Sequence, residues 1–367
     1  MVKVSQITIS EHSFDQQFKK PNDATKQCLT LLPAKDILNL LPKKTRSTLR
    51  FHLDDANSQL ANAIRRCLED ELFTLSMTFN IMHDSDGKPA DFIHDLQTND
   101  KEIFGKCDEL KKRIEAIPIR QDIIPNEWKI TLNVSNPGGD IDLLDIKSSD
   151  FKLIHKGKQV PVDTLMYPNY ILMRLRPKRQ LTISNINIVG GIGRNNANSF
   201  KYVTNIYYEI DEKPLTKVNG KYVGKSSMES NYKKFNIGYS TYRNGIHIFD
   251  PIKNTCKVLV DRLHNILTEW DNITKGMTET SDKILVNKVA DSYMITIENE
   301  GYTIANMLSY YIFQEMPSTE FSSGGIKHLD KEGAIIIIKN KNYLTIFANA
   351  TKAAIKDLQA IDVAFKK

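Results

Sequence analysis

One segment of this chain occurs twice, and the repeat restricts the folds open to it. Residues 48–73 match residues 292–317 without a gap, each residue corresponding to the one 244 positions further on. Both copies begin with apolar residues at alternate positions, as in a half-buried strand, and continue with apolar residues three and four apart, as in an amphipathic helix. The repeat therefore predicts two strand–turn–helix units. Their apolar positions are 49, 51, 53, 60, 63, 64, 67 and 68 in the first copy, and 293, 295, 297, 304, 307, 308, 311 and 312 in the second.

Two further helices are predicted, over residues 252–273 and 344–365. Apolar residues three and four positions apart give each helix a seam that suits packing against another helix. Pro251 fits the first turn of the earlier one. We expect the two seams to pack together within one molecule, so that no homodimer is needed.

Changes in composition indicate the domain boundaries. Residues 275–285 are small and polar and lose the apolar periodicity, which is typical of a linker. Residues 120–195 carry short β-type runs between Pro, Gly and Asp turns, which predicts a β-rich insert. We expect an α+β protein with helices on one face of each antiparallel sheet. The predicted parts are an N-terminal extension (1–45), a first domain (46–119 and 196–274), the insert (120–195), the linker (275–285) and a second domain (286–367).

Both repeated helices carry an asparagine at the matched position, Asn62 and Asn306. Asparagine competes with the helix backbone, and its amide is costly to bury without a partner. One interpretation places both side chains in solvent. The other, which we adopt as the expectation, is that each amide bonds to a neighbouring strand or loop and fixes the helix against its sheet.

Three stretches of the first part resemble a known family. Residues 61–66 (ANAIRR) resemble the A-N-S-L-R-R helix of the third subunit of eukaryotic RNA polymerase II, the archaeal D subunit and the bacterial alpha subunit. Residues 113–119 (RIEAIPI) are similar to the R-L-G-L-I-P-L stretch of that family. Residues 191–198 (GIGRNNAN) are similar to its G-x-G-K-x-H-A-K turn, with Asn196 in place of the histidine. The resemblance implies that Arg113, Pro118 and Gly193 fix the fold.

The second copy of the repeat resembles the H-T-L-G-N-L-L helix of the eleventh subunit and its archaeal L counterpart. Tyr302 replaces the histidine and Ala305 the glycine, and the family's later P-H-P turn survives as residues 327–329 (KHL). A fusion of both subunits, with the segment 226–228 (SSM) before Phe235, is similar to the fused subunit of large nucleocytoplasmic DNA viruses.

This resemblance implies two alpha-subunit-like dimerisation folds in tandem, which together form a non-catalytic assembly platform of a DNA-directed RNA polymerase. The implied partners are the two largest subunits, which hold the catalytic site, and a small tenth- or twelfth-type subunit. Arg65 and Arg66 are the expected docking residues, because arginine is favoured at interfaces; the alternative is a solvated helix face. The implied location is the cytoplasm of the host cell, in a viral factory, and the virion.

Charge and composition favour a folded protein without a dedicated nucleic-acid surface. The chain is 41% hydrophobic and 26% charged, and its net charge of +6 comes from basic residues interleaved with acidic ones. No apolar run approaches the length of a membrane span, and residues 1–20 have no signal-peptide core. The sequence thus predicts neither direct specific nucleic-acid binding nor a membrane segment.

The cysteines and several near-motifs predict no cofactor and no metal. The four cysteines, Cys28, Cys67, Cys107 and Cys256, form no C-x-x-C pair. Residues 219–226 (NGKYVGKS) fall one residue short of a Walker A loop, and residues 191–196 start but do not complete a dinucleotide fingerprint. Asp140, Asp142 and Asp145 follow a Pro-Gly-Gly turn and are expected to be solvated. Two alternatives stay open: a nucleotide-dependent enzyme using the 219–226 loop, and a stand-alone nucleic-acid-binding module.

Overall fold

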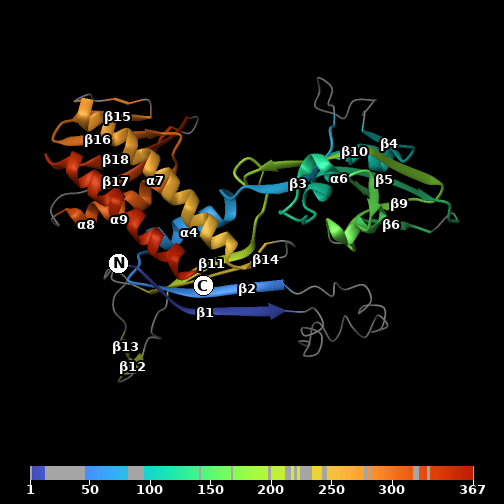
Figure 1. The fold of residues 1–367 in the computed structure, drawn as a ribbon, viewed down its shortest axis with the longest axis horizontal. Helices are drawn as coiled ribbons and strands as arrows, with labels where there is room; N and C mark the ends of the chain where they lie inside the picture. Colours follow the sequence, from blue (N-terminus) through green and yellow to red (C-terminus); the bar gives the residue numbers. More distant parts are fainter. Residues whose placement is uncertain are drawn as a thin grey trace.

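The fold belongs to the α+β class expected from the sequence. The described part contains six α-helices, two four-stranded antiparallel sheets, one six-stranded sheet and two two-stranded sheets. Figure 1 shows three parts: two that each combine a sheet with helices, and a third that projects to one side. The computed structural model describes residues 2–12, 46–81, 95–139, 142–166, 168–196, 200–210, 216–218, 221–223, 234–241, 246–276, 280–281, 283–316, 322–328 and 331–366.

The first half is built on a four-stranded sheet and two helices. Its sheet has the order β1-β2-β14-β11, with all neighbours antiparallel. Leu49, Phe51 and Leu53 of β2 are completely buried, because alternate side chains of a strand share one face and this face is covered. The elements are β1 (Lys3–His12), β2 (Arg46–Asp54), α4 (Ser58–Asp70), β11 (Thr204–Ile210), β14 (Lys234–Thr241) and α7 (Asp250–Gly276).

The second half has the same topology. Its strand order, β15-β16-β18-β17, repeats that of the first half. In both halves a helix follows the second and the fourth strand of the four-stranded sheet, counted in sequence order. The elements are β15 (Ile284–Val289), β16 (Ser292–Glu298), α8 (Tyr302–Glu315), β17 (Ser322–His328), β18 (Lys331–Ile338) and α9 (Tyr343–Ala364). The two predicted strand–turn–helix units are thus present as β2–α4 and β16–α8.

The turns inside the two units also match. Asp55 and Asn299, which correspond in the repeat, both have a left-handed backbone, with φ of 56° and 61°. Aspartate and asparagine tolerate this conformation better than most residues. In the first unit the Asn57 side chain then caps α4, its Oδ1 accepting from the backbone N–H of Leu60 at 2.7 Å.

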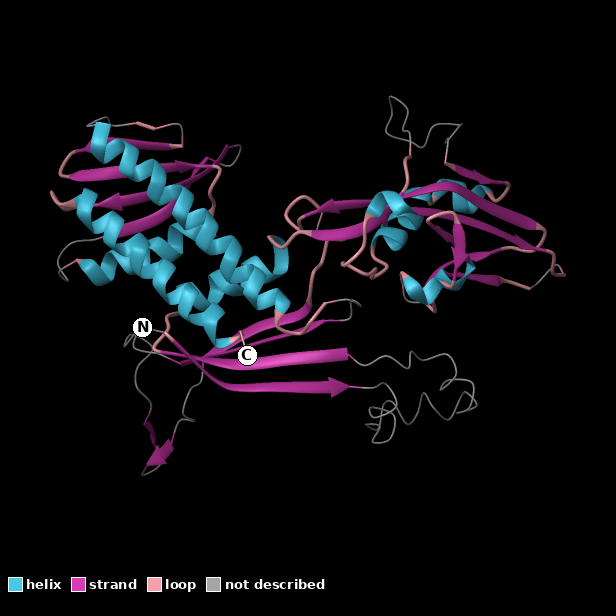
Figure 2. Cartoon of the chain, viewed as in Figure 1, coloured by secondary structure: helices cyan, strands magenta, loops and turns pink. Residues whose placement is uncertain are grey.

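The four long helices join the two halves. Helix α4 packs against α8, and α7 packs against α9. In Figure 2 the helices lie together, with the strands of one half on the left and those of the other below. Buried side chains from both halves form one continuous hydrophobic core. The expected packing of the seams 252–273 and 344–365 is therefore present.

The projecting part, which we call the insert, has its own core. Leu75 and Met77 at its beginning and Ile183 and Ile186 near its end belong to this second cluster. Its elements are β3 (Thr74–Thr78), β4 (Leu96–Thr98), α5 (Lys101–Gly105), α6 (Cys107–Glu115), β5 (Trp128–Asn136), β6 (Leu144–Lys147), β7 (Phe151–His155), β8 (Lys158–Val160), β9 (Ile171–Leu175) and β10 (Arg179–Gly191), with 3₁₀ turns at Pro125–Glu127, Ser148–Asp150 and Val162–Thr164.

The start of this core differs from the predicted start of the insert at residue 120. Residues 74–119, which the prediction assigned to the first domain, supply β3, β4, α5 and α6. The apolar side chains of β3 and α6 pack with the strands of the insert. They do so because β3 pairs with β10, the strand by which the chain leaves the insert. Thr74 and Gly191 are partners in this pair.

The predicted N-terminal extension includes a strand of the first sheet. Strand β1 pairs with β2 along its length, with a bulge between Ser5 and Thr8. The other residues of the range 1–45 lie outside the described part, except Val2. Within the predicted linker, α7 continues to Gly276 and β15 begins at Ile284.

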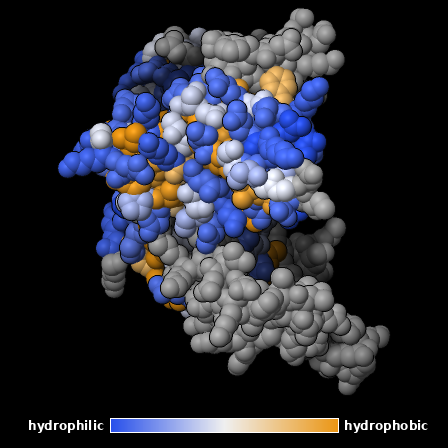
Figure 3. Space-filling view, turned by 90° about the vertical axis from the view of Figure 1, so that its right-hand side faces the viewer, coloured by the Kyte–Doolittle hydropathy of each residue, from blue (hydrophilic) through white to orange (hydrophobic). Residues whose placement is uncertain are grey.

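Two surface features complete the description. The outer end of the insert is mostly hydrophilic, with hydrophobic residues interspersed (Figure 3). Among the described helices, none combines the length and the hydropathy needed to cross a bilayer.

Candidate interface between the two halves

The contact between α7 and α9 centres on Trp270. Its indole is completely buried, and its ring centroid lies 4.2 Å from that of Phe347 in α9. Its Nε1–H donates to the carbonyl oxygen of Leu344 at 3.0 Å. A buried indole N–H without a partner would be costly, so this bond fixes where the two helices meet.

A chain of charged side chains forms a second contact, around Arg262 of the same helix α7. Arg262 of α7 lies between Glu71, at the C-terminal cap of α4, and Glu300, in the turn before α8. Its Nε lies 3.2 and 3.1 Å from the two carboxylate oxygens of Glu300, and its Nη1 lies 3.5 Å from Glu71. Glu71 also pairs with Arg194, which follows the insert. The chain therefore links the end of the insert, the first half and the second half.

Arg262 is charged in this setting. Burial opposes its charge, but the hydrogen bonds and the charge of Glu300, together with Glu71, outweigh burial and raise the pKa of the guanidinium above its ordinary value. Its side chain is 17% exposed and those of both glutamates are 12% exposed. At this degree of burial, removal of one partner leaves the other charge poorly solvated.

A third contact joins the first strand to the C-terminal helix. Asp357 of α9 accepts from the backbone N–H of Val2 and from the hydroxyl of Tyr311 in α8, both at 3.0 Å. Burial and the neighbouring carboxylate raise the pKa of Tyr311, so its hydroxyl remains a donor. The beginning of the first half is thereby attached to two helices of the second.

Gly193 lies where the chain returns from the insert to α4. A Cβ at this position would come within 3.0 Å of the Asp70 Cα and of the Glu69 carbonyl oxygen, so only glycine fits without a backbone shift. The next residue, Arg194, donates its backbone N–H to the carbonyl of Asp70 at 2.9 Å and so satisfies the end of α4. The fold-fixing role of Gly193 stays a prediction.

The two predicted docking residues lie on α4, where both side chains are half-buried. Arg65 bonds within its own helix, with Nη1 2.7 Å from Glu69 and Nε 3.1 Å from the Asn62 amide oxygen. Arg66 corresponds in the repeat to Tyr310, which packs against the core in the second half. The two halves therefore present different side chains at these positions.

The two asparagines lie in different settings. The Asn62 amide oxygen bonds to Arg65 rather than to a neighbouring strand or loop. Asn306 is exposed on α8. Asn306 therefore fits the interpretation that places the side chain in solvent. For Asn62, the hydrogen bond of the amide oxygen lies within α4 instead of joining α4 to its sheet.

Arg113 and Pro118 lie in the insert rather than between the halves. Arg113 in α6 donates to the carbonyl of Leu172 in β9 at 2.7 Å and to Glu109 at 2.6 Å, so it holds the helix on its sheet. Pro118 precedes Ile119, which forms a β-bridge with Met166. Neither residue contacts the chain of charges around Arg262 through any interaction identified among the described residues.

The near-motifs do not come together into a site in the described part. Residues 221–223 of the Walker-like stretch form β13, which pairs with β12 (Thr216–Val218), and the rest of that stretch lies outside the described residues. Asp145 pairs with Arg174 at 3.0 Å. Cys67, Cys107 and Cys256 are buried free thiols. Burial raises the pKa of Cys67 to about 12, which keeps its thiol protonated.

Sequence reasoning missed Arg262 and Glu300. Arg262 lies off the apolar seam of its helix, and Glu300 lies in a turn 38 positions later. No local spacing connects them. The available signals were an acidic residue beside a turn, Glu300, and an arginine in the middle of a helix whose other basic residues are lysine and histidine.

These contacts define a class of protein: a single chain whose two halves have the same sheet topology and pair through their helices. No family model matches the chain. Curated proteins named "DNA-directed RNA polymerase RPB3-11 homolog" do match it. Those of African swine fever virus isolates from a South African tick and a Namibian warthog are each 26% identical over 166 residues, covering 42% of this chain and 45% of the relative. A relative from a Kenyan pig isolate matches at the same identity and coverage.

The match spans less than half the length of each relative. Within that span the chain is similar to a viral RNA polymerase subunit of the RPB3-11 type. The resemblance to a fused polymerase subunit, inferred above from sequence motifs, is thereby confirmed.

Proposed function

We propose that this chain is a non-catalytic assembly subunit of a multisubunit DNA-directed RNA polymerase that acts in viral transcription. Its two halves pair within one molecule, as two alpha-subunit-like dimerisation folds, and the pair docks the two largest subunits. The catalytic site belongs to those subunits, and this chain carries no cofactor of its own. A small tenth- or twelfth-type subunit is a further proposed partner. The proposed location is the host-cell cytoplasm, in the viral factory, and the virion.

The observation that carries the proposal is the pairing of two halves with one strand order. In each half a helix follows the second and fourth strands, and the four helices pack into a shared core. Such an arrangement buries the apolar faces of both halves against each other and leaves other surfaces for partners. The viral relatives are named as RNA polymerase subunits, and this supports other polymerase subunits as the proposed partners.

We assign docking to the outward side of α4 around Arg65 and Arg66. Both side chains are half-buried rather than fully extended into solvent, and Arg65 is held by Asn62 and Glu69. A guanidinium held in this way loses less conformational freedom when it binds a partner carboxylate. The corresponding residues of the second half are Ser309 and Tyr310, so we propose that the first half recruits the large subunits and the second completes the pair.

The test is co-expression of the tagged chain with the other polymerase subunits of its source genome, followed by pull-down and mass spectrometry. The wild type should recover the two largest subunits. Arg65→Glu with Arg66→Glu should fold normally by circular dichroism and lose them, because charge reversal at an interface opposes like charges. Lys352→Glu with Lys356→Glu, on the exposed side of α9, makes the same charge change and should retain them. Failure of the wild type to recover any polymerase subunit would contradict the proposed function.

A further inference from the structure

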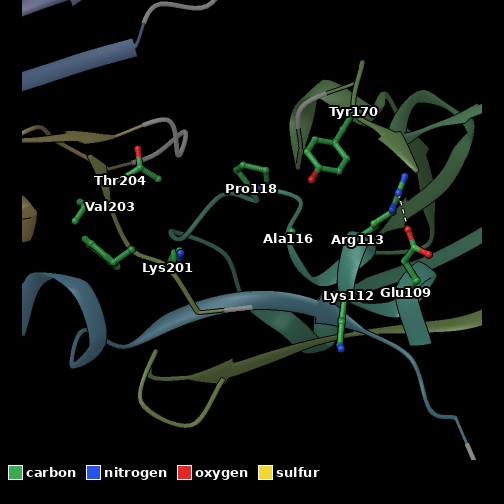
Figure 4. Close-up of a pocket in the computed structure, with 10 residues that line it drawn as sticks. Glu109, Lys112, Arg113, Ala116, Pro118, Tyr170, Lys201, Val203 and Thr204 are labelled. Atoms are coloured by element: carbon green, nitrogen blue, oxygen red, sulfur yellow. Dashed lines mark hydrogen bonds and ion pairs between the residues drawn. The ribbon is translucent and has the colours of Figure 1, made fainter. Parts of the chain in front are cut away.

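A cleft of about 400 Å³ lies between the insert and the first half (Figure 4). One wall is the end of α6 and the turn after it, from Lys112 to Pro118. The opposite wall is the segment from Lys201 to Thr204, which leads into β11. Tyr170 of the insert contributes an aromatic side chain to the same cleft. Two parts of the fold that share no strand therefore form one concave surface.

The polar side chains of the cleft leave two positive charges unbalanced. The charge of Arg113 is matched by Glu109 at 2.6 Å, and its Nη1 is used by the Leu172 carbonyl. Lys112 and Lys201 are exposed, on opposite walls, and neither forms an ion pair with a residue that the structure describes. In Figure 4 the Lys112 side chain points from α6 away from Tyr170 and Pro118, so this exposed, flexible side chain must turn to reach an occupant, while Lys201 lies on the opposite wall.

The remaining lining is largely apolar. Ala116 and Pro118 belong to one wall and Val203 to the other, and Tyr202, whose side chain is buried with 8% exposure, also lines the cleft. Pro118 has no backbone N–H to offer, and the aliphatic surface can exclude water from an apolar side chain. A pocket with apolar walls and a few fixed charges suits a peptide that carries both kinds of side chain.

We propose that this cleft binds an acidic, extended segment of a partner polymerase subunit, with carboxylates bound by Lys112 and Lys201 and an apolar side chain against Pro118 and Val203. The proposal rests on the proposed function, because it requires polymerase subunits as partners, but it concerns a different surface from Arg65 and Arg66. A nucleic-acid strand fits less well. Such a strand needs a row of cations and several exposed rings for stacking, whereas here Glu109 pairs with Arg113, Tyr202 is buried and Tyr170 is half-buried.

The first experiment identifies the occupant. The chain carrying the photoreactive residue benzoylphenylalanine in place of Tyr170 is co-expressed with the other polymerase subunits of its source genome. After irradiation, the crosslinked peptide is identified by mass spectrometry. We expect a segment of another polymerase subunit with at least two Asp or Glu residues close together. A crosslink to nucleic acid, or to a segment without acidic residues, would overturn the proposal.

The second experiment measures the charge contribution. The crosslinked peptide is synthesised with a fluorescent label and titrated with the wild type and with Lys112→Glu/Lys201→Glu. The double reversal should raise the Kd at least tenfold, and the wild-type affinity should fall as salt rises. Lys129→Glu/Lys152→Glu, two exposed lysines on strands of the insert sheet, is the matched control and should change the Kd less than twofold.

The outcomes separate this proposal from the proposed function. If the wild type recovers no polymerase subunit, the proposed function fails. If it recovers them while Tyr170 crosslinks to none of them, or while Lys112→Glu/Lys201→Glu binds the peptide as the wild type does, the cleft proposal alone fails. Circular dichroism and the retained recovery of the large subunits show whether the double variant is folded.

Discussion

Arg262 of the first half binds Glu300 of the second half through an Nε that lies 3.2 and 3.1 Å from its two carboxylate oxygens. Both side chains are largely buried. The pair lies where the turn before α8 meets α7, so it fixes the angle at which the two halves come together. A buried ion pair adds little stability over an apolar contact, but its partial removal is costly.

Glu300→Gln should therefore destabilise the pairing of the halves by about 3 kcal/mol, because the Arg262 charge would lose its closest partner. Urea denaturation followed by the fluorescence of Trp270, in a Trp128→Phe background, measures this change at the interface itself. Arg174→Gln removes an exposed pair with Asp145 of similar length and should cost less than about 1 kcal/mol. Equal effects of the two variants would show that the Arg262 pair behaves as a surface pair.

Trp270→Ala should weaken the contact of α7 with α9 by about 3–5 kcal/mol, since it leaves a cavity beside Phe347. Trp270→Phe keeps most of the packing and loses the bond to Leu344, so it should cost about 1 kcal/mol. Hydrogen exchange should accelerate in α7 and α9 for the alanine variant. The control is Trp128→Ala, which should accelerate exchange in the insert alone. Faster exchange confined to α7, with α9 unchanged, would contradict the pairing.

Asp100 should make the insert sensitive to acid. Its hydrogen bonds with Arg176 lower the pKa of the carboxyl, against the effect of burial. A lowered pKa in the folded state means that its contribution is complete above about pH 4 and is lost as the pH falls through the folded value. Asp100→Asn keeps the cap on Glu102 N–H and removes the charge. It should cost about 1–3 kcal/mol at pH 7 and flatten the acid dependence below pH 4.

The measurement for Asp100 is denaturation of the insert at pH 7, 5, 4 and 3, followed by the fluorescence of Trp128 in a Trp270→Phe background. The wild type should lose stability toward pH 3 more steeply than the variant. Parallel pH profiles would show that another carboxylate sets the acid sensitivity.

Asn306→Leu should change the stability by less than about 0.5 kcal/mol, because its side chain is exposed. Asn62→Leu removes the acceptor that holds Arg65 and should cost about 1 kcal/mol. It should also reduce the recovery of large subunits in the pull-down, which Asn306→Leu should not. Thermal unfolding by circular dichroism compares the two variants directly, and a larger loss for Asn306→Leu would reverse the assignment.

The repeat could be predicted from sequence because its signals are local. The alternation at 49, 51 and 53 and the helical stripe that follows reproduce the observed β2 and α4, and their partners 244 positions later reproduce β16 and α8. Even the left-handed turn residues, Asp55 and Asn299, follow the repeat. Periodicity indicates which face of a helix or strand is buried. Here it was enough to predict the strand–turn–helix unit of each half.

The site depends on contacts that periodicity does not report. Residues 74–119 have amphipathic patterns that fit either core, and only the pairing of β3 with β10 assigns them to the insert. Asn62 and Asn306 occupy the same position of the repeat but have different surroundings. One turn after Asn62, α4 carries Arg65, which binds the amide oxygen, whereas α8 carries Ser309 at the corresponding position. Arg262 and Glu300 meet only after the two halves have packed.

The antiparallel pair of β3 and β10 brings the entrance and the exit of the insert together at Thr74 and Gly191. In the second half only residues 316–321 separate α8 from β17, although the four-stranded sheet has the same strand order. Because the insert begins and ends at paired residues, it hardly increases the distance between α4, which precedes it, and β11, which follows it. A change in the length of the insert at this point would therefore leave the sheet and the two helices of the half in place.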